Sequence, residues 1–200
     1  MKKLLFSASV LAGFAFTSSQ ANALVVINVI ESGGSLIFNT SGSLNLSGAS
    51  FLGGIGEADG FISGGSNWYI ASGSAGSVDN YAMTTFAGPF GTNFDFISNP
   101  TTSIGDQFFI WGNGGDTEQV GVPVGYLSGT LFNSSMTFAG LTIGGIGLLS
   151  GTYNYAIPND NIVLNIGKVS AVPLPAALPL FLGSLAGVGF VARRRKQKSA

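Results

Sequence analysis

TYNYAIPNDNIVLNIG, residues 152–167, is the stretch that decides the fold expected for this chain. Before its centre, Tyr153 and Tyr155 alternate with polar Thr and Asn side chains. Successive side chains of a β-strand point to opposite faces, so this period of two predicts one apolar and one polar face. The central PNDN segment (158–161) is rich in turn-forming residues. The stretch is therefore predicted to be two strands joined by a tight connection.

Similar short apolar runs recur through the middle of the chain at a spacing of about ten residues, separated by Gly, Ser and Asn clusters. No run has the 3.6-residue apolar period of a helix. Many short strands must pair two sheets or close a barrel to bury their apolar faces, so we expect an all-β fold, an antiparallel β-sandwich-like body over residues 24–171. The predicted strands are 24–30, 35–40, 43–48, 67–72, 93–98, 107–112, 152–157 and 162–167.

Charge is distributed unevenly along the chain. Seven of the eight basic residues lie near the two ends, and residues 24–171 contain Lys168 against all nine acidic residues. One lysine and nine acids give this body a formal charge of −8. A body almost without Lys or Arg cannot neutralise phosphate groups, so we expect no nucleic-acid partner.

Cysteine and histidine are absent from the whole chain. Disulfides, Ser-His-Asp and Cys-His catalysis, and the usual zinc ligands are therefore excluded. We accordingly expect no enzyme, no cofactor and no metal site, although chemistry with Asp and Glu alone stays open.

The first 23 residues have the features of a secretory signal peptide. Lys2 and Lys3 precede an apolar run from residue 4 to residue 16, and Ala21-Asn22-Ala23 follows. A run of about 13 residues spans roughly 20 Å as a helix, which is too short for a 30 Å bilayer core. We expect signal peptidase to recognise Ala21 and Ala23 and to cut after Ala23.

The other end of the chain predicts a single transmembrane helix in contact with membrane lipid. Residues 176–192 are 17 residues without a charge, roughly 25 Å as a helix, near the lower limit for spanning a bilayer. A basic tail, residues 193–198, follows with Arg193, Arg194, Arg195 and Lys196. Such clusters stay in the cytoplasm, so the body is expected on the far side of the membrane.

The order of a Pro-x-Pro motif, an apolar segment and an arginine cluster resembles the PEP-CTERM sorting signal. The motif comprises Val172, Pro173, Leu174, Pro175 and Ala176. Leu174 stands where the family's name has Glu, and VPLPAA is a frequent variant. The resemblance implies that residues 172–200 are cut near the motif by an exosortase-like membrane transpeptidase. It further implies transfer from the inner membrane to the envelope surface or matrix of an exopolysaccharide-producing bacterium.

A second, weaker resemblance lies within the body. VPVGYLSGTLFNSS (122–135), followed by GLLSGTYNY (147–155), is similar to segments of exported proteins that carry this tail. That group has no assigned activity, so the resemblance implies kinship without a mechanism.

Three functions follow as hypotheses. The first is a noncatalytic envelope or matrix protein that acts by surface display, adhesion or association with exopolysaccharide. The second is a polysaccharide-active enzyme that uses Glu57 with Asp59, or Asp116 with Glu118, because residues i and i+2 of a strand lie about 7 Å apart on one face.

The third hypothesis is a calcium-stabilised, lectin-like module, because carboxylates and carbonyls on glycine-rich loops suit this cation. Its candidate ligands are Asn113, Asp116 and Glu118, with Asp59 or Asp160 as further donors. Aromatic side chains can also stack on sugar rings where they are exposed, whereas most aromatic residues of apolar strands belong to a core. The candidates for sugar stacking are Trp68, Tyr69, Trp111, Tyr126, Tyr153 and Tyr155.

Overall fold

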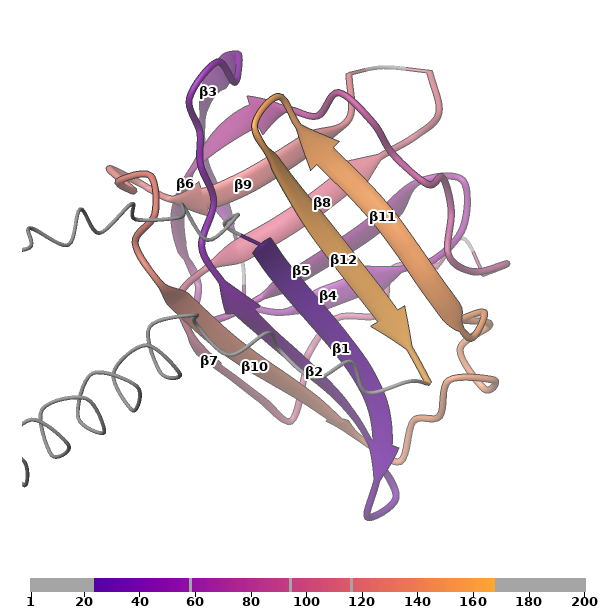
Figure 1. Cartoon of the computed structure of the whole chain (residues 1–200). Helices are drawn as coiled ribbons and strands as arrows, with labels where there is room; N and C mark the ends of the chain where they lie inside the picture. The colour runs from indigo at the N-terminus through magenta and orange to yellow at the C-terminus, as the bar shows by residue number, and fades with distance from the viewer. Residues whose placement is uncertain (1–23, 58, 94, 116, 168–200) are drawn as a thin grey trace, which may run out of the picture.

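The structure is a computed structural model that describes residues 24–57, 59–93, 95–115 and 117–167 (Figure 1). Within these ranges the chain forms strands, turns and loops, and contains no helix that could cross a bilayer. The predicted signal peptide, the sorting motif, the transmembrane segment at 176–192 and the basic cluster lie outside the described residues, so they stay predictions.

The described strands form two six-stranded sheets, called sheet A and sheet B. Sheet A has the order β11 (Gly151–Ile157), β12 (Asp160–Ile166), β1 (Leu24–Ser32), β2 (Ser35–Gly42), β10 (Phe132–Ala139) and β7 (Thr102–Gly105). Sheet B has the order β3 (Phe51–Glu57), β6 (Gly76–Ala82), β9 (Gln119–Pro123), β8 (Phe108–Gly112), β5 (Trp68–Ser72) and β4 (Phe61–Ser63).

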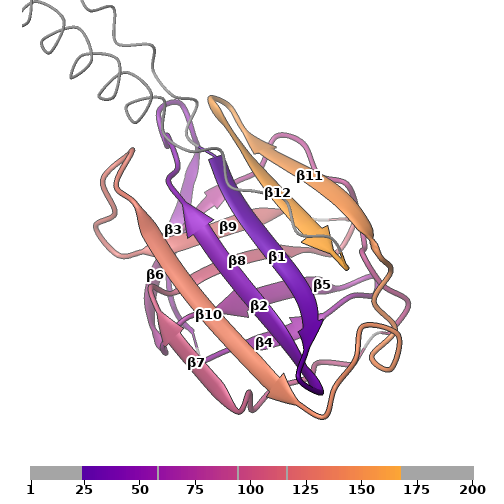
Figure 2. The ribbon, with the colours of Figure 1, turned by 60° about the horizontal axis from the view of Figure 1, so that its bottom comes forward.

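The two sheets face each other, and their strands cross at a steep angle in both ribbon views (Figures 1 and 2). This arrangement confirms the expected all-β fold with two packed sheets. Crossed sheets bury the side chains of their inner faces in one shared core. The core contains residues from both sheets, with Trp68, Phe38, Phe108 and Tyr155 among its largest fully buried side chains.

One ladder departs from the expected antiparallel pairing. β1 and β12 run parallel, from Leu24 opposite Asn161 to Val29 opposite Ile166, whereas the other ladders of the two sheets are antiparallel. Parallel neighbours need a long connection. Here almost the whole body lies between the two strands, because β1 is the first and β12 the last described strand.

The hairpin expected from residues 152–167 is confirmed. β11 and β12 pair antiparallel, and Ile157 lies opposite Asp160. The connection is therefore a two-residue loop, Pro158 and Asn159, at the centre of the segment that the turn residues indicated.

Two predicted strands, 43–48 and 93–98, are wrong. The first runs as an irregular segment because side chains and loops, rather than a neighbouring strand, take up its backbone groups. The N–H groups of residues 44, 45 and 46 donate to Tyr126 Oη (2.8 Å), Asp160 Oδ2 (2.6 Å) and Ser128 Oγ (2.9 Å). Among the described residues of the second segment, 93 and 95–98, the bridge that forms is the isolated one between Ile97 and Ile62.

The remaining six predicted segments coincide with strands β1, β2, β5, β8, β11 and β12. The expected list omits β3, β4, β6, β7, β9 and β10, which lie in stretches richer in Gly, Ser and Asn. Sequence alternation therefore located the strands with continuous runs of bulky side chains and missed those that are short or interrupted by small or polar residues.

Candidate functional site

Sheet B is apolar on both of its faces. Trp68 and Ile70 of β5 belong to the main core between the sheets. The residues that alternate with them, Tyr69 and Ala71, belong to a second buried cluster with Phe109. Neighbours along a strand point to opposite faces. The second cluster therefore lies on the face of sheet B that is turned away from sheet A.

We call five rings on this face the outer aromatic cluster: Phe61, Tyr69, Phe96, Phe109 and Trp111. Tyr69 stacks on Phe109 with ring centroids 5.3 Å apart, and its ring is tilted by 31° against that of Phe61 at 4.7 Å. Phe96 approaches both Tyr69 and Phe61 at 6.4 Å. Trp111 lies opposite Tyr69 on the neighbouring strand, and directly opposite side chains share a face.

Exposure increases across this cluster from its centre to its rim. Phe109 and Tyr69 are buried, Phe61 and Trp111 are half-buried, and Phe96 is 54% exposed. The rim therefore offers aromatic surface to solvent, while the centre holds those rings in place. Exposed aromatic faces are suited to stacking on the apolar faces of sugar rings.

A glycine on β9 makes room for the central ring. Gly121 lies opposite Phe109, and a Cβ atom at Gly121 would overlap the Phe109 ring. The ring consequently lies over the backbone of the neighbouring strand. This places Phe109 flat under the stacked ring of Tyr69, from which it is tilted by only 19°.

One carboxyl group adjoins the cluster. Burial raises the pKa of Glu57, and the nearby Tyr69 hydroxyl lowers it by less. Burial also raises the pKa of Tyr69 far above its ordinary value, and the charge of Glu57 adds to that effect. The Tyr69 hydroxyl is therefore neutral at physiological pH, and it is buried without a hydrogen-bond partner among the described residues.

No cation balances this carboxylate within the described residues, because the sequence has no Lys or Arg between residues 24 and 167. A surface with rings, one carboxyl group and no positive charge repels anionic ligands. The outer aromatic cluster therefore suits an uncharged ligand with apolar faces.

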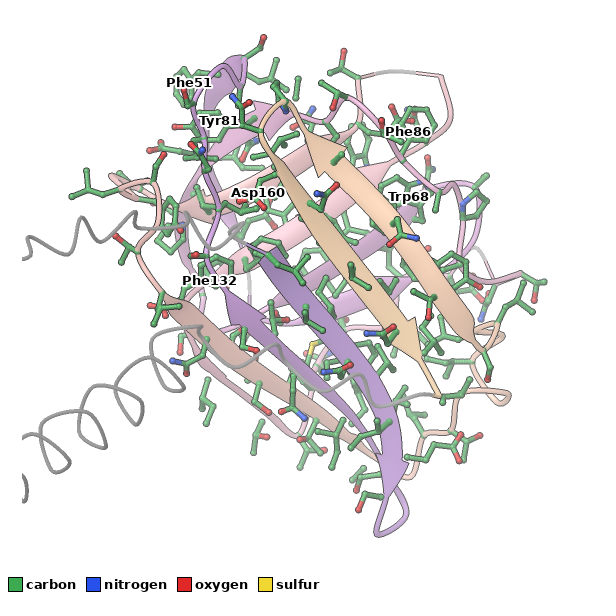
Figure 3. All side chains as sticks on the ribbon, viewed as in Figure 1. Phe51, Trp68, Tyr81, Phe86, Phe132 and Asp160 are labelled. Carbon is green, nitrogen blue, oxygen red and sulfur yellow. The ribbon has the colours of Figure 1, made fainter. Side chains whose placement is uncertain are left out.

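The aromatic residues singled out from the sequence fall into three settings. Trp68 (labelled in Figure 3) and Tyr155 are fully buried in the main core with ring centroids 5.0 Å apart, so neither can contact a sugar. Tyr126 and Tyr153 are half-buried, and their hydroxyls donate to the carbonyls of residues 130 and 149. Only Tyr69 and Trp111 belong to the outer aromatic cluster.

Phe61, Phe96 and Phe109 were not among the sequence candidates. For Phe109 the signal was present, since the QFFIWG stretch places residues 109 and 111 on the same face of a strand. Phe96 could not be found in this way, because it lies in a loop that approaches Tyr69 only in the folded chain.

The carboxylate pairs proposed for catalysis do not share strand faces as expected. β3 ends at Glu57, so the exposed Asp59 lies beyond it, and β9 begins one residue after Glu118. Glu118 is only 4% exposed, and its Cγ lies next to Gly112, as the Trp68 ring does. Asp116 lies outside the described residues.

Two of the candidate calcium ligands accept hydrogen bonds from backbone N–H groups. Asp160 accepts hydrogen bonds from the backbone N–H groups of Asn45 (2.6 Å) and Asn161 (2.7 Å). Asn113 Oδ1 accepts one from the N–H of Gly115 at 2.9 Å. Among the described residues, no three acidic side chains come together as a metal ligand set would require.

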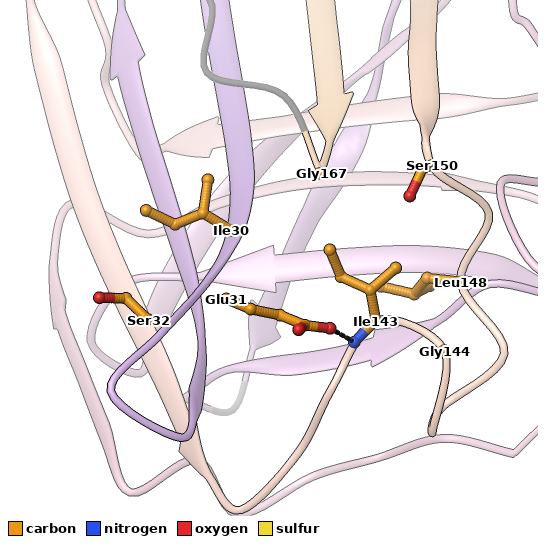
Figure 4. A pocket seen from close by; sticks show the side chains of 8 residues that line it. All are labelled: Ile30, Glu31, Ser32, Ile143, Gly144, Leu148, Ser150 and Gly167. Atoms are coloured by element: carbon orange, nitrogen blue, oxygen red, sulfur yellow. Dashed lines mark hydrogen bonds between the residues drawn. The ribbon is translucent and has the colours of Figure 1, made fainter.

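An open hollow of about 640 Å³ lies elsewhere, at the end of the sandwich where the described chain stops (Figure 4). The β1–β2 turn and the 143–150 loop form its walls, and Gly167 borders it. Glu31 is the one ionisable residue among those that line it, and its Oε1 accepts a hydrogen bond from Ile143 N at 2.5 Å. Because that oxygen is engaged by backbone, the hollow offers little for catalysis.

Comparisons of the chain with family models, with curated proteins and with solved structures found no match.

Proposed function

We propose that this chain is an exported, noncatalytic cell-envelope or matrix protein that associates with polysaccharide. The observation that carries the proposal is the pair of sequence patterns at its ends: residues 1–23 have the features of a signal peptide, and residues 172–200 resemble a PEP-CTERM signal. On this proposal the chain is exported, held in the inner membrane with its C-terminus in the cytoplasm, and then released by an exosortase-like transpeptidase.

The connection between the described body and the Pro-x-Pro motif is short. The described body ends at Gly167, and the Pro-x-Pro motif begins five residues later, at Val172. Five residues reach at most roughly 17 Å. On this proposal, a membrane enzyme would cut close to the end of the sandwich that carries Gly167.

The outer aromatic cluster is the surface that we propose for the polysaccharide. Its support is the partial exposure of Phe96 and Trp111, together with the lack of cations that an acidic polymer would need. The ligand class proposed is therefore a neutral glycan, bound by stacking at the rim of the cluster.

Processing is tested by the intact mass of the mature protein from cells with and without the sorting enzyme. We expect cleavage after Ala23 in both, and a C-terminus shortened near residues 172–176 only when the enzyme is present. An unshortened C-terminus in both strains would refute the sorting proposal. Replacement of the Pro-x-Pro prolines by alanine is the matched control, since it alters the motif without touching the body.

Glycan association is tested separately, by affinity electrophoresis of the mature protein in a gel that contains a soluble neutral glucan. Phe96→Ala should weaken retardation, whereas Phe86→Ala should not. The two residues are 54% and 45% exposed, and no ring contact links Phe86 to the cluster in the described part of the chain. Equal retardation of both variants would refute the proposed surface, and retardation by a uronate-rich polymer alone would refute the ligand class.

A further inference from the structure

A row of side chains on the outer face of sheet B passes from aromatic rings to an amide. Trp111 lies opposite Tyr69 on one side and opposite Gln119 of β9 on the other. Directly opposite side chains share a face, with their Cβ atoms about 4.5–5.5 Å apart. Gln119 is half-buried, as Trp111 is, so an amide that solvent can reach is carried next to the indole ring.

A second amide holds Gln119 in place. Asn80 of β6 lies opposite Gly121, two residues along β9 from Gln119, so the two amides are diagonal neighbours on the same face. Asn80 Nδ2 donates to Gln119 Oε1 at 3.3 Å. Asn80 is only 5% exposed, and its Oδ1 is buried without a partner in the described part of the chain. Asn80 is therefore the fixed member of the pair.

This hydrogen bond determines what Gln119 offers to a ligand. A primary amide has one carbonyl oxygen, which accepts, and two N–H groups, which donate. Oε1 is turned towards Asn80, whereas Nε2 has no hydrogen-bond partner among the described residues. The group that Gln119 turns away from Asn80 is therefore an uncharged hydrogen-bond donor.

We propose that Gln119 is the polar half of a glycan subsite at Trp111. Its Nε2 donates to a hydroxyl oxygen at the edge of a sugar ring that stacks on the indole. This subsite rests on the glycan association proposed above, to which it adds a requirement for a hydroxyl group at that edge. Asn80 is a positioning residue, because it orients the Gln119 amide without touching the sugar.

A neutral glycan fits both groups of this subsite. An aromatic face takes the apolar face of a sugar ring, and the hydroxyl groups at the edge of that ring are acceptors for a neighbouring amide. A purely apolar occupant would bury the N–H groups of Gln119 without a partner, which is unfavourable. An anionic ligand would find no Lys or Arg between residues 24 and 167.

Two substitutions of Gln119 test the direction of the hydrogen bond. Gln119→Leu removes the amide, whereas Gln119→Glu keeps an oxygen that accepts from Asn80 and removes the donor. Affinity electrophoresis of the mature protein in a soluble neutral glucan should show binding weakened about two- to tenfold by each, the range of a neutral hydrogen bond. Asn154→Leu is the matched control and should bind as the wild type does, because Asn154 is exposed on β11 of sheet A.

The outcomes separate this subsite from the proposed function. A Gln119→Glu variant that binds as the wild type does would overturn the donor role, since a carboxylate only accepts. A Gln119→Leu variant with wild-type binding, alongside a weakened Phe96→Ala variant, would overturn the subsite and leave the proposed function standing. Wild-type binding by Phe96→Ala would refute the proposed surface and the subsite on it together.

The positioning role of Asn80 is read from a double-mutant cycle. Asn80→Leu should also weaken binding, because an unheld Gln119 amide can turn either end towards the sugar. In the Gln119→Leu background it should have no further effect on binding, since no amide is left to orient. Equal losses of affinity in both backgrounds would overturn the positioning role. Because Gln119 is half-buried, its own variants keep the subsite testable even where Asn80→Leu lowers stability.

Discussion

The two faces of sheet B have the same kind of residues and different surroundings. On the inner face, Trp68 is completely buried between the sheets, 5.0 Å from Tyr155 and 6.1 Å from Phe90. On the outer face, Trp111 lies in a smaller cluster whose rim is open to solvent. Both tryptophans come from neighbouring strands of one sheet, so residue type alone does not separate a core residue from a candidate ligand contact.

The two tryptophans differ in which face of sheet B their place in the strand alternation gives them. Residues 68 and 112 are directly opposite each other, as are residues 69 and 111. The side chains of the two pairs therefore project to opposite faces of sheet B. Only the face that carries Trp68 packs against sheet A. Sheet A thus buries the aromatic side chains on the inner face of sheet B, whereas those on the outer face stay partly accessible to solvent.

The largest expected difference between the faces is in the free energy of unfolding. Trp68→Ala should lower it by about 3–5 kcal/mol, because a large cavity would remain between two sheets that cannot collapse into it. Trp111→Ala should lower it by about 1 kcal/mol, because solvent can reach the half-buried site. Urea unfolding of the mature protein measures both values. Equal losses would show that the outer face is as tightly packed as the core.

A smaller contrast is expected from two glycines that lie under aromatic rings. A Cβ atom at Gly112 would overlap Trp68 and Glu118 Cγ, and one at Gly121 would overlap Phe109. Gly112→Ala should cost about 1–3 kcal/mol, because overpacking in the closed core has no outlet. Gly121→Ala should cost less, because the outer rings can move toward solvent. Thermal unfolding of the two variants would contradict this if Gly121→Ala were the more damaging.

The sequence was sufficient for the parts of the fold that local patterns determine. The β11–β12 hairpin followed from alternating tyrosines and a turn-forming segment, and its two strands pair through a loop at Pro158. Strands β5 and β8 were likewise found from their bulky residues. In each case the side chains needed for the prediction lie within a few residues of one another.

The errors have a different physical origin, because they depend on partners remote in sequence. Residues 43–48 alternate like a strand, but Tyr126, Ser128 and Asp160 take up their N–H groups and leave no place for a neighbouring strand. The outer aromatic cluster was found only in part for the same reason. Tyr69 and Trp111 were named, whereas Phe96 reaches Tyr69 from a loop whose course no local pattern indicates.

Removal of one hydroxyl from each environment should sharpen the comparison further. Tyr155 Oη donates to Gly88 O at 3.3 Å in the core, and the Tyr69 hydroxyl interacts with Glu57 on the outer face. Tyr155→Phe should cost about 0.5–1.5 kcal/mol at pH 7, and Tyr69→Phe should cost less, because the Tyr69 hydroxyl makes no hydrogen bond within the described residues. Only the Tyr69→Phe loss should shrink at acidic pH, where Glu57 is protonated. Urea titrations at pH 4 and pH 7 would contradict this if both losses stayed constant.

The smallest expected effect is the contribution of Glu57 to the pH dependence of stability. Burial raises its pKa above the unfolded value of 4.5, so the folded chain holds this proton more tightly than the unfolded chain does. Stability from this group is therefore present below pH 4.5 and is lost as the pH rises from there through the raised folded pKa. Asp160 acts in the same direction from 3.8, since burial raises its pKa against two backbone hydrogen bonds.

Glu57→Gln should accordingly flatten the decline in stability between pH 4 and pH 7, and should leave the part due to Asp160. The difference in unfolding free energy between wild type and variant, taken at each pH, gives the contribution of Glu57, because the other carboxyl groups are common to both proteins. The effect is small, since Glu57 is only half-buried and water screens its charge. If the two pH profiles run parallel, folding does not shift the pKa of Glu57. The inner and outer faces of sheet B would then differ in packing alone.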